Sequence, residues 1–77
     1  MYERIVDGGH SWLKVPKAEV VAVGLQPSTY SYQDTEHYYL EEDCDAVAFI
    51  EAKGSVKETV TEVDDFPHLD NISRINI

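Results

Sequence analysis

The sequence predicts a small α+β domain, in which one antiparallel or mixed sheet carries two short helices. Length, composition and pattern lead to this prediction. The chain has 77 residues, the length of one domain, and its hydrophobic content of 43% is typical of chains that fold around a core. Some segments have apolar residues at every second position, as strands do, and others have them at helical spacing. Turn residues separate these segments. The expected order over the single domain 1–77 is strand, helix, hairpin, helix, strand and tail.

The N-terminal part of the chain predicts strand structure on both sides of a turn. Residues 1–6 fit either a first strand or a frayed end. Asp7-Gly8-Gly9 predicts a turn, because glycine adopts positive φ without strain. The segment His10–Val15 predicts a strand, in which Trp12 is expected to be half buried as a core anchor.

The middle of the chain predicts a helix, a hairpin and a second helix. Pro16–Gly24 favours a helix, since proline suits the first helical position and glycine suits a left-handed cap. Thr29–Tyr32 and His37–Glu41 predict the two arms of a hairpin around a polar turn. Cys44–Lys53 predicts the second helix, with Asp43 as its N-cap, because a carboxylate there can accept from amides of the first turn. The inward face of this helix is expected to consist of Cys44, Val47, Phe49 and Ile50.

The C-terminal part allows more than one interpretation. The valines of residues 56–63 have helical spacing, but the density of β-branched residues favours a strand, which is the expected structure. The tail over residues 69–77 fits either an irregular docked segment or a last short strand. We therefore expect residues 1–6 and 67–77 to be the less ordered parts of the domain.

The charge of the chain restricts its partners. Fifteen acidic residues against six basic ones give a formal net charge of −9. Nucleic acids and anionic membranes are recognised through Lys and Arg, so we expect no direct nucleic-acid binding and no membrane association. A basic protein surface is the expected partner, and plain solubility is the competing explanation of the charge. The single cysteine excludes an intramolecular disulfide and suits a reducing compartment, which predicts a cytoplasmic location.

The negative charge is concentrated in residues 34–45, which we call the acidic segment. It holds six acidic residues in twelve positions and contains no Lys or Arg. One hypothesis is a partner-binding surface, to which nearby tyrosines add contact area at low entropic cost. The other is a solvated edge that caps a helix and discourages edge pairing. The residues predicted to bind the partner are Asp34, Glu36, Glu41, Glu42, Asp43, Asp45, Tyr32 and Tyr38.

Metal binding and catalysis are the alternatives to a binding surface. His10, His37, His68 and Cys44 offer ligand atoms, but none of them has a diagnostic metal-site spacing, and no cofactor is expected. The acids beside Cys44 destabilise a thiolate, so a buried structural cysteine is the prediction. We therefore expect a protein that is not an enzyme. A small metal-binding or hydrolytic protein that uses His10, Cys44 and nearby acids is one alternative, and a structural homo-oligomer, for example a homodimer, is another.

Three stretches together resemble a group of small, uncharacterised acidic proteins of bacterial phages, plasmids and integrative elements. The stretches are DGGHSWLKVP at 7–16, YSY at 30–32 and YLEEDCDA at 39–46. The pattern of the group is approximately DGGHGWLxVP, YSY and YLEEDCDA, so Ser11 replaces the usual glycine, and the similarity covers residues 7–50. The resemblance carries no established chemistry. It implies a mobile-element context, in which small acidic proteins of the anti-CRISPR and anti-restriction kinds antagonise host defence, some by mimicking the charge of DNA.

Charge, tyrosines and resemblance lead to one functional hypothesis. The chain is expected to be a non-enzymatic protein-interaction module that inhibits a host nucleic-acid-binding defence complex, as an anti-CRISPR protein or a DNA mimic does. Its partner would be a basic surface of a host protein or nucleoprotein complex.

Overall fold

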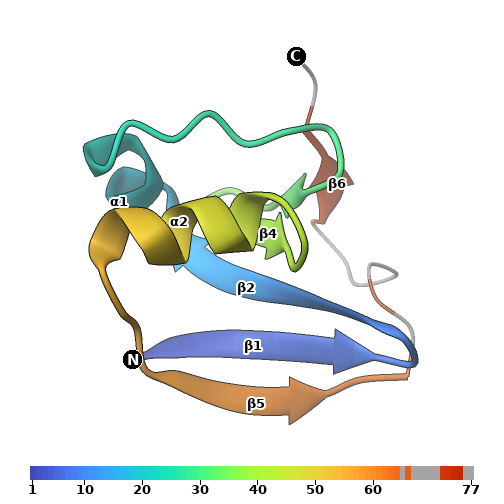
Figure 1. Ribbon diagram of the computed structural model, residues 1–77. Coiled ribbons are helices and arrows are strands. Elements are labelled where there is room, and N and C mark those ends of the chain that lie inside the picture. Colours follow the sequence, from blue (N-terminus) through green and yellow to red (C-terminus); the bar gives the residue numbers. More distant parts are fainter. Residues whose placement is uncertain (65, 67–71, 76–77) are drawn as a thin grey trace.

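The computed structural model describes residues 1–64, 66 and 72–75. Within this part of the chain, six strands form one mixed sheet, and two helices cover one of its faces (Figure 1). The α+β prediction is therefore confirmed. In chain order the elements are β1 (Tyr2–Asp7), β2 (His10–Pro16), α1 (Lys17–Ala22), β3 (Tyr32–Gln33), β4 (His37–Glu41), α2 (Asp45–Lys53), β5 (Glu58–Glu62) and β6 (Ser73–Arg74).

The sheet has the strand order β5-β1-β2-β4-β3-β6. β1 and β2 form an antiparallel hairpin whose turn passes through Gly8 at a φ of 51°, as the turn prediction requires. Residues 2–7 are thus a strand. β5 runs parallel to β1, which confirms the strand interpretation of residues 56–63. It is held there by Arg4, whose guanidinium contacts Glu58 at 2.8 Å and lowers the pKa of that carboxyl.

The predicted hairpin in the middle of the chain is present, but its first arm is short and displaced. Only Tyr32–Gln33 pairs with β4, so the expected strand over Thr29–Tyr32 is wrong for its first three residues. The physical reason lies in two serines. Ser28 and Ser31 turn toward each other, with the Ser31 amide donating to the Ser28 carbonyl at 3.2 Å, and both hydroxyls bind a carboxylate of α2.

The second helix begins one residue later than expected and without the expected cap. Cys44 occupies the cap position and makes no side-chain hydrogen bond to the helix. The carboxylate of Asp43 does not cap the helix, so that prediction is wrong. The amide of Asp43 instead donates to Glu41 at 3.0 Å. The helix stops before Gly54, as the sequence predicts, and the positive φ of 94° at this position suits glycine.

The inward face of α2 is narrower than predicted. Phe49 is fully buried and Ile50 half buried, as expected, but Cys44 and Val47 are exposed. Cys44 precedes the helix, and Val47 lies on the side of the helix that faces away from the sheet. The expectation of a buried structural cysteine is therefore wrong.

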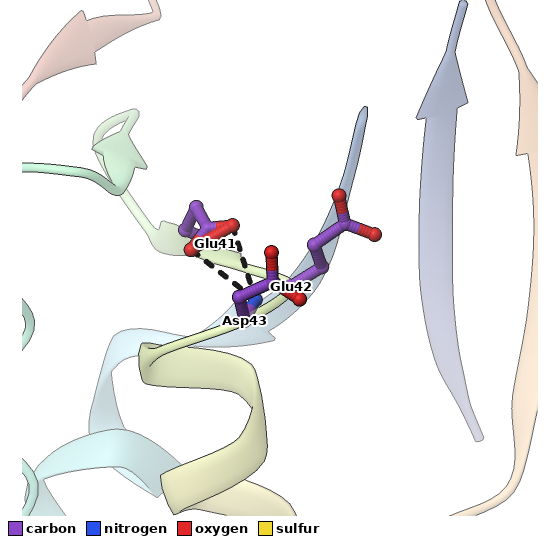
Figure 2. Close-up of side chains that lie close together, drawn as sticks. All are labelled: Glu41, Glu42 and Asp43. Atoms are coloured by element: carbon purple, nitrogen blue, oxygen red, sulfur yellow. Dashed lines mark hydrogen bonds between the residues drawn. The ribbon is translucent and has the colours of Figure 1, made fainter. Parts of the chain in front are cut away.

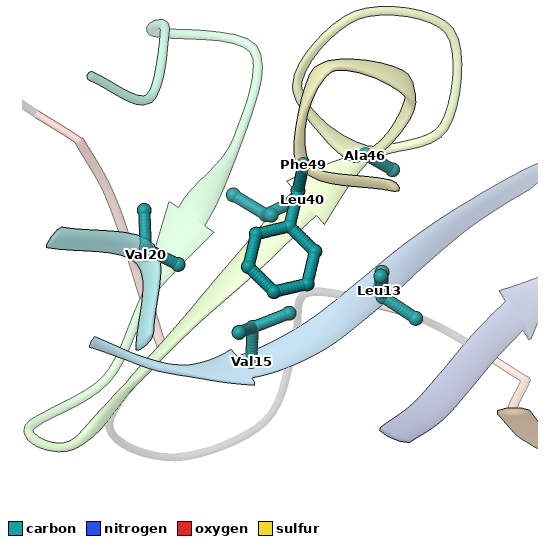
Figure 3. Close-up of a cluster of buried hydrophobic side chains, with 6 residues drawn as sticks. All are labelled: Leu13, Val15, Val20, Leu40, Ala46 and Phe49. Atoms are coloured by element: carbon teal, nitrogen blue, oxygen red, sulfur yellow. The ribbon is translucent and has the colours of Figure 1, made fainter. Parts of the chain in front are cut away.

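The core has two parts, because adjacent residues of a strand point to opposite faces of the sheet. The first part lies between the helices and the sheet, where the ring of Phe49 packs against β2 and β4 (Figure 3). Its fully buried members are Leu13, Val15, Val20, Leu40, Ala46 and Phe49.

The second part of the core lies on the face of the sheet that the helices do not cover. It consists of Ile5, Trp12, Tyr39 and Phe66. Trp12 was expected to be half buried, but it is 7% exposed, because Phe66 packs on it with ring centroids 4.3 Å apart.

The C-terminal part contributes a last short strand, one of the alternatives that the sequence allows. β6 pairs antiparallel with β3, and the following Ile75 is buried. The other apolar positions of the tail, Leu69 and Ile77, lie outside the described residues. No helix in the described ranges is both long and apolar enough to cross a membrane.

Candidate partner-binding surface

The fold divides the acidic segment between two ends of the sheet. Asp34 and Glu36 precede β4, whereas Glu41, Glu42 and Asp43 follow or end it. Five strand steps lead from Glu36 to Glu41, which separates the two groups by about 16 Å at an ordinary strand rise. The segment is therefore not one continuous patch, and each end has its own geometry.

Asp34 organises the turn before β4. Its carboxylate accepts hydrogen bonds from the amides of Glu36 and His37 at 2.9 and 2.6 Å and from the hydroxyl of Tyr39 at 2.7 Å. Burial alone would raise the pKa of Asp34, but these hydrogen bonds outweigh burial and hold the pKa below its ordinary value. Burial and the bond to Asp34 raise the pKa of Tyr39. Asp34 thus has a structural role, while Glu36 beside it is exposed.

Asp45 is not at the surface. It is 6% exposed, and its carboxylate accepts from the amide and the hydroxyl of Ser28, each at 2.8 Å, and from the hydroxyl of Ser31. This carboxylate fastens the loop before β3 to the start of α2. Because Asp45 is buried and its Oδ2 atom accepts three hydrogen bonds, this residue is not part of the exposed acidic surface.

Glu41, Glu42 and Asp43 form the densest negative point of the structure, and we call them the acidic trio. Each offers a carboxylate oxygen, and these oxygens lie within 4.8 Å of one another at the junction of β4 and α2 (Figure 2). Two hydrogen bonds from the Asp43 amide to the Glu41 carboxylate, dashed in Figure 2, fix the arrangement.

The three members of the acidic trio are held to different degrees. Glu42 accepts from the hydroxyl of Ser11 at 3.1 Å and lies 3.9 Å from Nδ1 of His10. Asp43 is exposed, and within the described residues neither Glu41 nor Asp43 forms an ion pair. Unpaired carboxylates this close repel one another, so an added positive charge is favourable here.

The acidic trio is also the group of described residues that could share a metal ion. Carboxylate oxygens are ligands for hard cations such as Ca²⁺ and Mg²⁺. Exposed acids at these separations are common without an ion. The expectation that the protein uses no cofactor stays a prediction.

A recess with aromatic walls opens beside the acidic trio, on the face of the sheet that the helices leave uncovered. Its volume is about 440 Å³. Tyr32 lines it together with the buried rings of Trp12 and Phe66, while Tyr30 at its border is 65% exposed. The carboxylates that line it are those of Asp7, Glu41 and Asp43.

Part of this recess was not predicted from the sequence. Tyr32, Glu41 and Asp43 were predicted site residues, and the structure brings them together. Tyr30, Asp7 and Arg74 were not predicted. A signal for Tyr30 was present in its position beside Tyr32, but the register that brings Arg74 alongside Tyr32 has no local sequence signal.

Tyr38 lies apart from the recess. It points to the face covered by the helices, where it packs partly against the first core, and the Lys17 ammonium lies 5.2 Å from the centre of its ring. Tyr38, Asp34 and Glu36 therefore do not share a surface with the acidic trio.

The two described histidines of the enzymatic or metal-binding alternative lie far apart. His10 begins β2, whereas His37 pairs with Pro16 at the other end of that strand, which places the two about 20 Å apart. Cys44 is exposed at the start of α2. His68 lies outside the described residues. The recess lined by His10 contains neither His37 nor Cys44 in its lining.

Comparison with protein-family models, curated proteins and solved structures finds no match for this chain. The residues and their geometry therefore carry the functional argument.

Proposed function

We propose that this chain is a non-catalytic protein-binding module that engages a basic surface of its partner through the acidic trio and the recess beside it. One observation carries the proposal. Glu41 and Asp43 form no ion pair among the described residues, and they line the same recess as the exposed ring of Tyr30. In protein interfaces, aromatic anchors such as tyrosine supply contact area, and charged groups supply specificity.

The overall charge supports the same proposal. A net charge of −9 steers a basic partner toward the molecule, and the acidic trio concentrates that field at one point. Binding of this kind weakens as salt rises, because mobile ions screen exposed charges.

The partner that fits this chemistry best is a nucleic-acid-binding component of a host defence complex, met in the cytoplasm. Proteins that bind nucleic acid present Lys and Arg to phosphates, and the acidic trio would occupy such a site as a DNA mimic does. The resemblance to small acidic proteins of mobile elements favours this choice. On this proposal the protein is an inhibitor of the anti-CRISPR or anti-restriction kind.

The test compares variants of equal net charge. Glu41→Gln with Asp43→Asn removes two charges from the acidic trio, and glutamine keeps an oxygen that can accept from the Asp43 amide. The control is Glu51→Gln with Glu62→Gln, which removes two charges from exposed positions on α2 and β5. Each immobilised protein captures partners from a bacterial lysate at low salt, and captured proteins are identified by mass spectrometry.

The proposal predicts that a basic protein binds the wild type and the control and is lost from the acidic-trio variant. Duplex DNA should release that protein, since the two compete for one basic site. Equal capture by both double variants would show that binding depends only on the net charge of the protein and not on the acidic trio. A captured protein indifferent to DNA would contradict the DNA-mimic mechanism.

A further inference from the structure

We infer that the recess beside the acidic trio binds the guanidinium group of one arginine side chain of the partner. This inference rests on the proposed function and names the chemical group that the binding surface recognises. The recess holds about 440 Å³, within the range of about 300–1,000 Å³ that ligand pockets occupy. That space admits one long side chain.

The charges around the recess fit a single cation. Asp7, Glu41 and Asp43 contribute three carboxylates and Arg74 one guanidinium, so the lining has a net charge of −2 while His10 is neutral. The Asp7 carboxylate already accepts from the Phe66 amide at 2.8 Å. Both carboxylate oxygens of Glu41 accept from the Asp43 amide, so Asp43 is the lining carboxylate that accepts no hydrogen bond from the described residues.

The aromatic wall already holds a guanidinium of the chain itself. Arg74 stacks over the ring of Tyr32 at 4.9 Å and donates to the Thr29 carbonyl at 3.0 Å. Because this arginine covers Tyr32, a second guanidinium has the exposed ring of Tyr30 as its stacking surface.

The planar aromatic wall and the adjacent carboxylates favour arginine over lysine. A guanidinium is flat and weakly hydrated, so it stacks on a tyrosine ring and keeps its edge N–H groups for carboxylate oxygens. An ammonium is a compact, strongly hydrated charge that lacks the flat face. A side chain that both stacks on Tyr30 and bonds to Asp43 therefore requires the flat face and edge N–H groups of arginine.

Trp12 adds a second feature of the recess. It lines the recess, is 7% exposed, and its indole N–H has no hydrogen-bond partner among the described residues. A buried N–H without an acceptor is unfavourable.

The position of Trp12 also provides the measurement. It is the only tryptophan of the chain, so its fluorescence reports on the recess alone. The probe is acetyl-Gly-Arg-Gly-amide, compared with two peptides in which citrulline or lysine replaces arginine. Citrulline has nearly the shape of arginine without its charge. The inference predicts a saturable fluorescence change with the arginine peptide and at least fivefold weaker binding of each of the others.

The variants Tyr30→Ala and Asp43→Asn should each weaken the arginine peptide at least threefold. Both positions are exposed, so the fold is expected to persist, and circular dichroism checks it. Glu51→Gln is the matched control, because it removes the same charge as Asp43→Asn far from the recess. Equal effects of Asp43→Asn and Glu51→Gln would overturn the inference, as would a lysine or citrulline peptide that binds as tightly as the arginine peptide.

The outcome is separable from that of the proposed function. If the acidic-trio variant loses its protein partner while the three peptides bind alike, the inference fails and the binding surface stands. If the arginine peptide binds selectively while both double variants capture the same partner, the recess stands and the proposed function fails.

Discussion

Aspartate serves opposite purposes within the acidic segment. Asp45 is buried under two serines and Asp34 ties a turn, whereas Asp43 faces outward beside Glu41. The sequence predicts all of them as surface acids. It cannot separate them, because the partners of Asp45 lie 14 and 17 positions away in the chain and are adjacent only after folding.

We expect Asp45→Ala to lower the free energy of unfolding by about 2–4 kcal/mol, because it leaves hydrogen-bond donors of Ser28 and Ser31 without their charged acceptor. Asp45→Asn keeps one acceptor oxygen and should lose less. Urea unfolding followed by circular dichroism measures both. Equal stability of Asp45→Ala and the wild type would show that the serine loop does not depend on this carboxylate.

Because the pKa of Asp34 is lowered in the folded chain, we predict that the free energy of unfolding depends on pH. Its pKa is lower in the folded chain than in the unfolded chain, so the folded chain binds fewer protons as pH falls toward the acidic range. The stabilisation is present above about pH 4, the ordinary pKa of aspartate, and is lost as pH falls through the folded-state value. Asp34→Asn should therefore destabilise the chain at pH 7 and converge with the wild type once the pH falls below the folded-state pKa. A constant difference across that range, measured by urea unfolding, would contradict the assignment.

At the scale of elements, the spacing of apolar residues and the positions of turn residues predict most of the fold. The β1–β2 turn, β4, α2 and β5 lie where the pattern places them, because glycine positions and alternation are local signals. The first hairpin arm fails because the serine contacts to Asp45 replace strand pairing over Thr29–Ser31. The sequence also does not predict how deeply Trp12 is buried, because Phe66, which covers it, is distant in the chain.

Two positions of α2 give a matched pair for the packing of this helix. Phe49 is fully buried and meets Tyr2 edge-on at 5.5 Å, whereas Val47 is 44% exposed. Phe49→Ala should lower the free energy of unfolding by about 3–5 kcal/mol through the cavity it leaves, and Val47→Ala by less than about 1 kcal/mol. Phe49→Leu, which leaves a smaller cavity, extends the comparison if the alanine variant does not fold. Similar losses at both positions would mean that α2 does not pack as described.

At the scale of the whole molecule, the edge of the sheet formed by β5 bears on self-association. β5 ends the strand order, and its Val60 is 64% exposed. Antiparallel pairing of two copies about Val60 would place Glu58 opposite Glu62, and like charges directly opposite each other are destabilising. This arrangement disfavours a dimer through β5, although the sequence leaves a homodimer open.

We therefore expect the wild type to sediment as a monomer at micromolar concentration. Glu62→Lys removes the repulsion and places opposite charges across the same pairing, so this variant should associate more than the wild type. Analytical ultracentrifugation of both proteins measures the difference. A stable wild-type dimer that Glu62→Lys weakens would favour the homo-oligomer alternative.

The function of the whole molecule depends on whether its charge acts at one place. We propose that it acts at the acidic trio and the recess beside it. The remaining acidic residues stabilise loops, form contacts between strands or add to the overall negative field. The sequence predicts the acidic segment, but the division of that segment by β4 appears only in the fold.

The most direct measurement is the dissociation constant of the captured partner at two salt concentrations, by titration calorimetry, for the wild type and the two double variants of equal net charge. The account predicts that Glu41→Gln with Asp43→Asn weakens binding at least about tenfold, or about 1.4 kcal/mol, at low salt. It also predicts that this variant has a smaller salt dependence than Glu51→Gln with Glu62→Gln, because fewer charge pairs remain to be screened. Equal dissociation constants and equal salt dependence for the two variants would contradict a localised acidic binding surface.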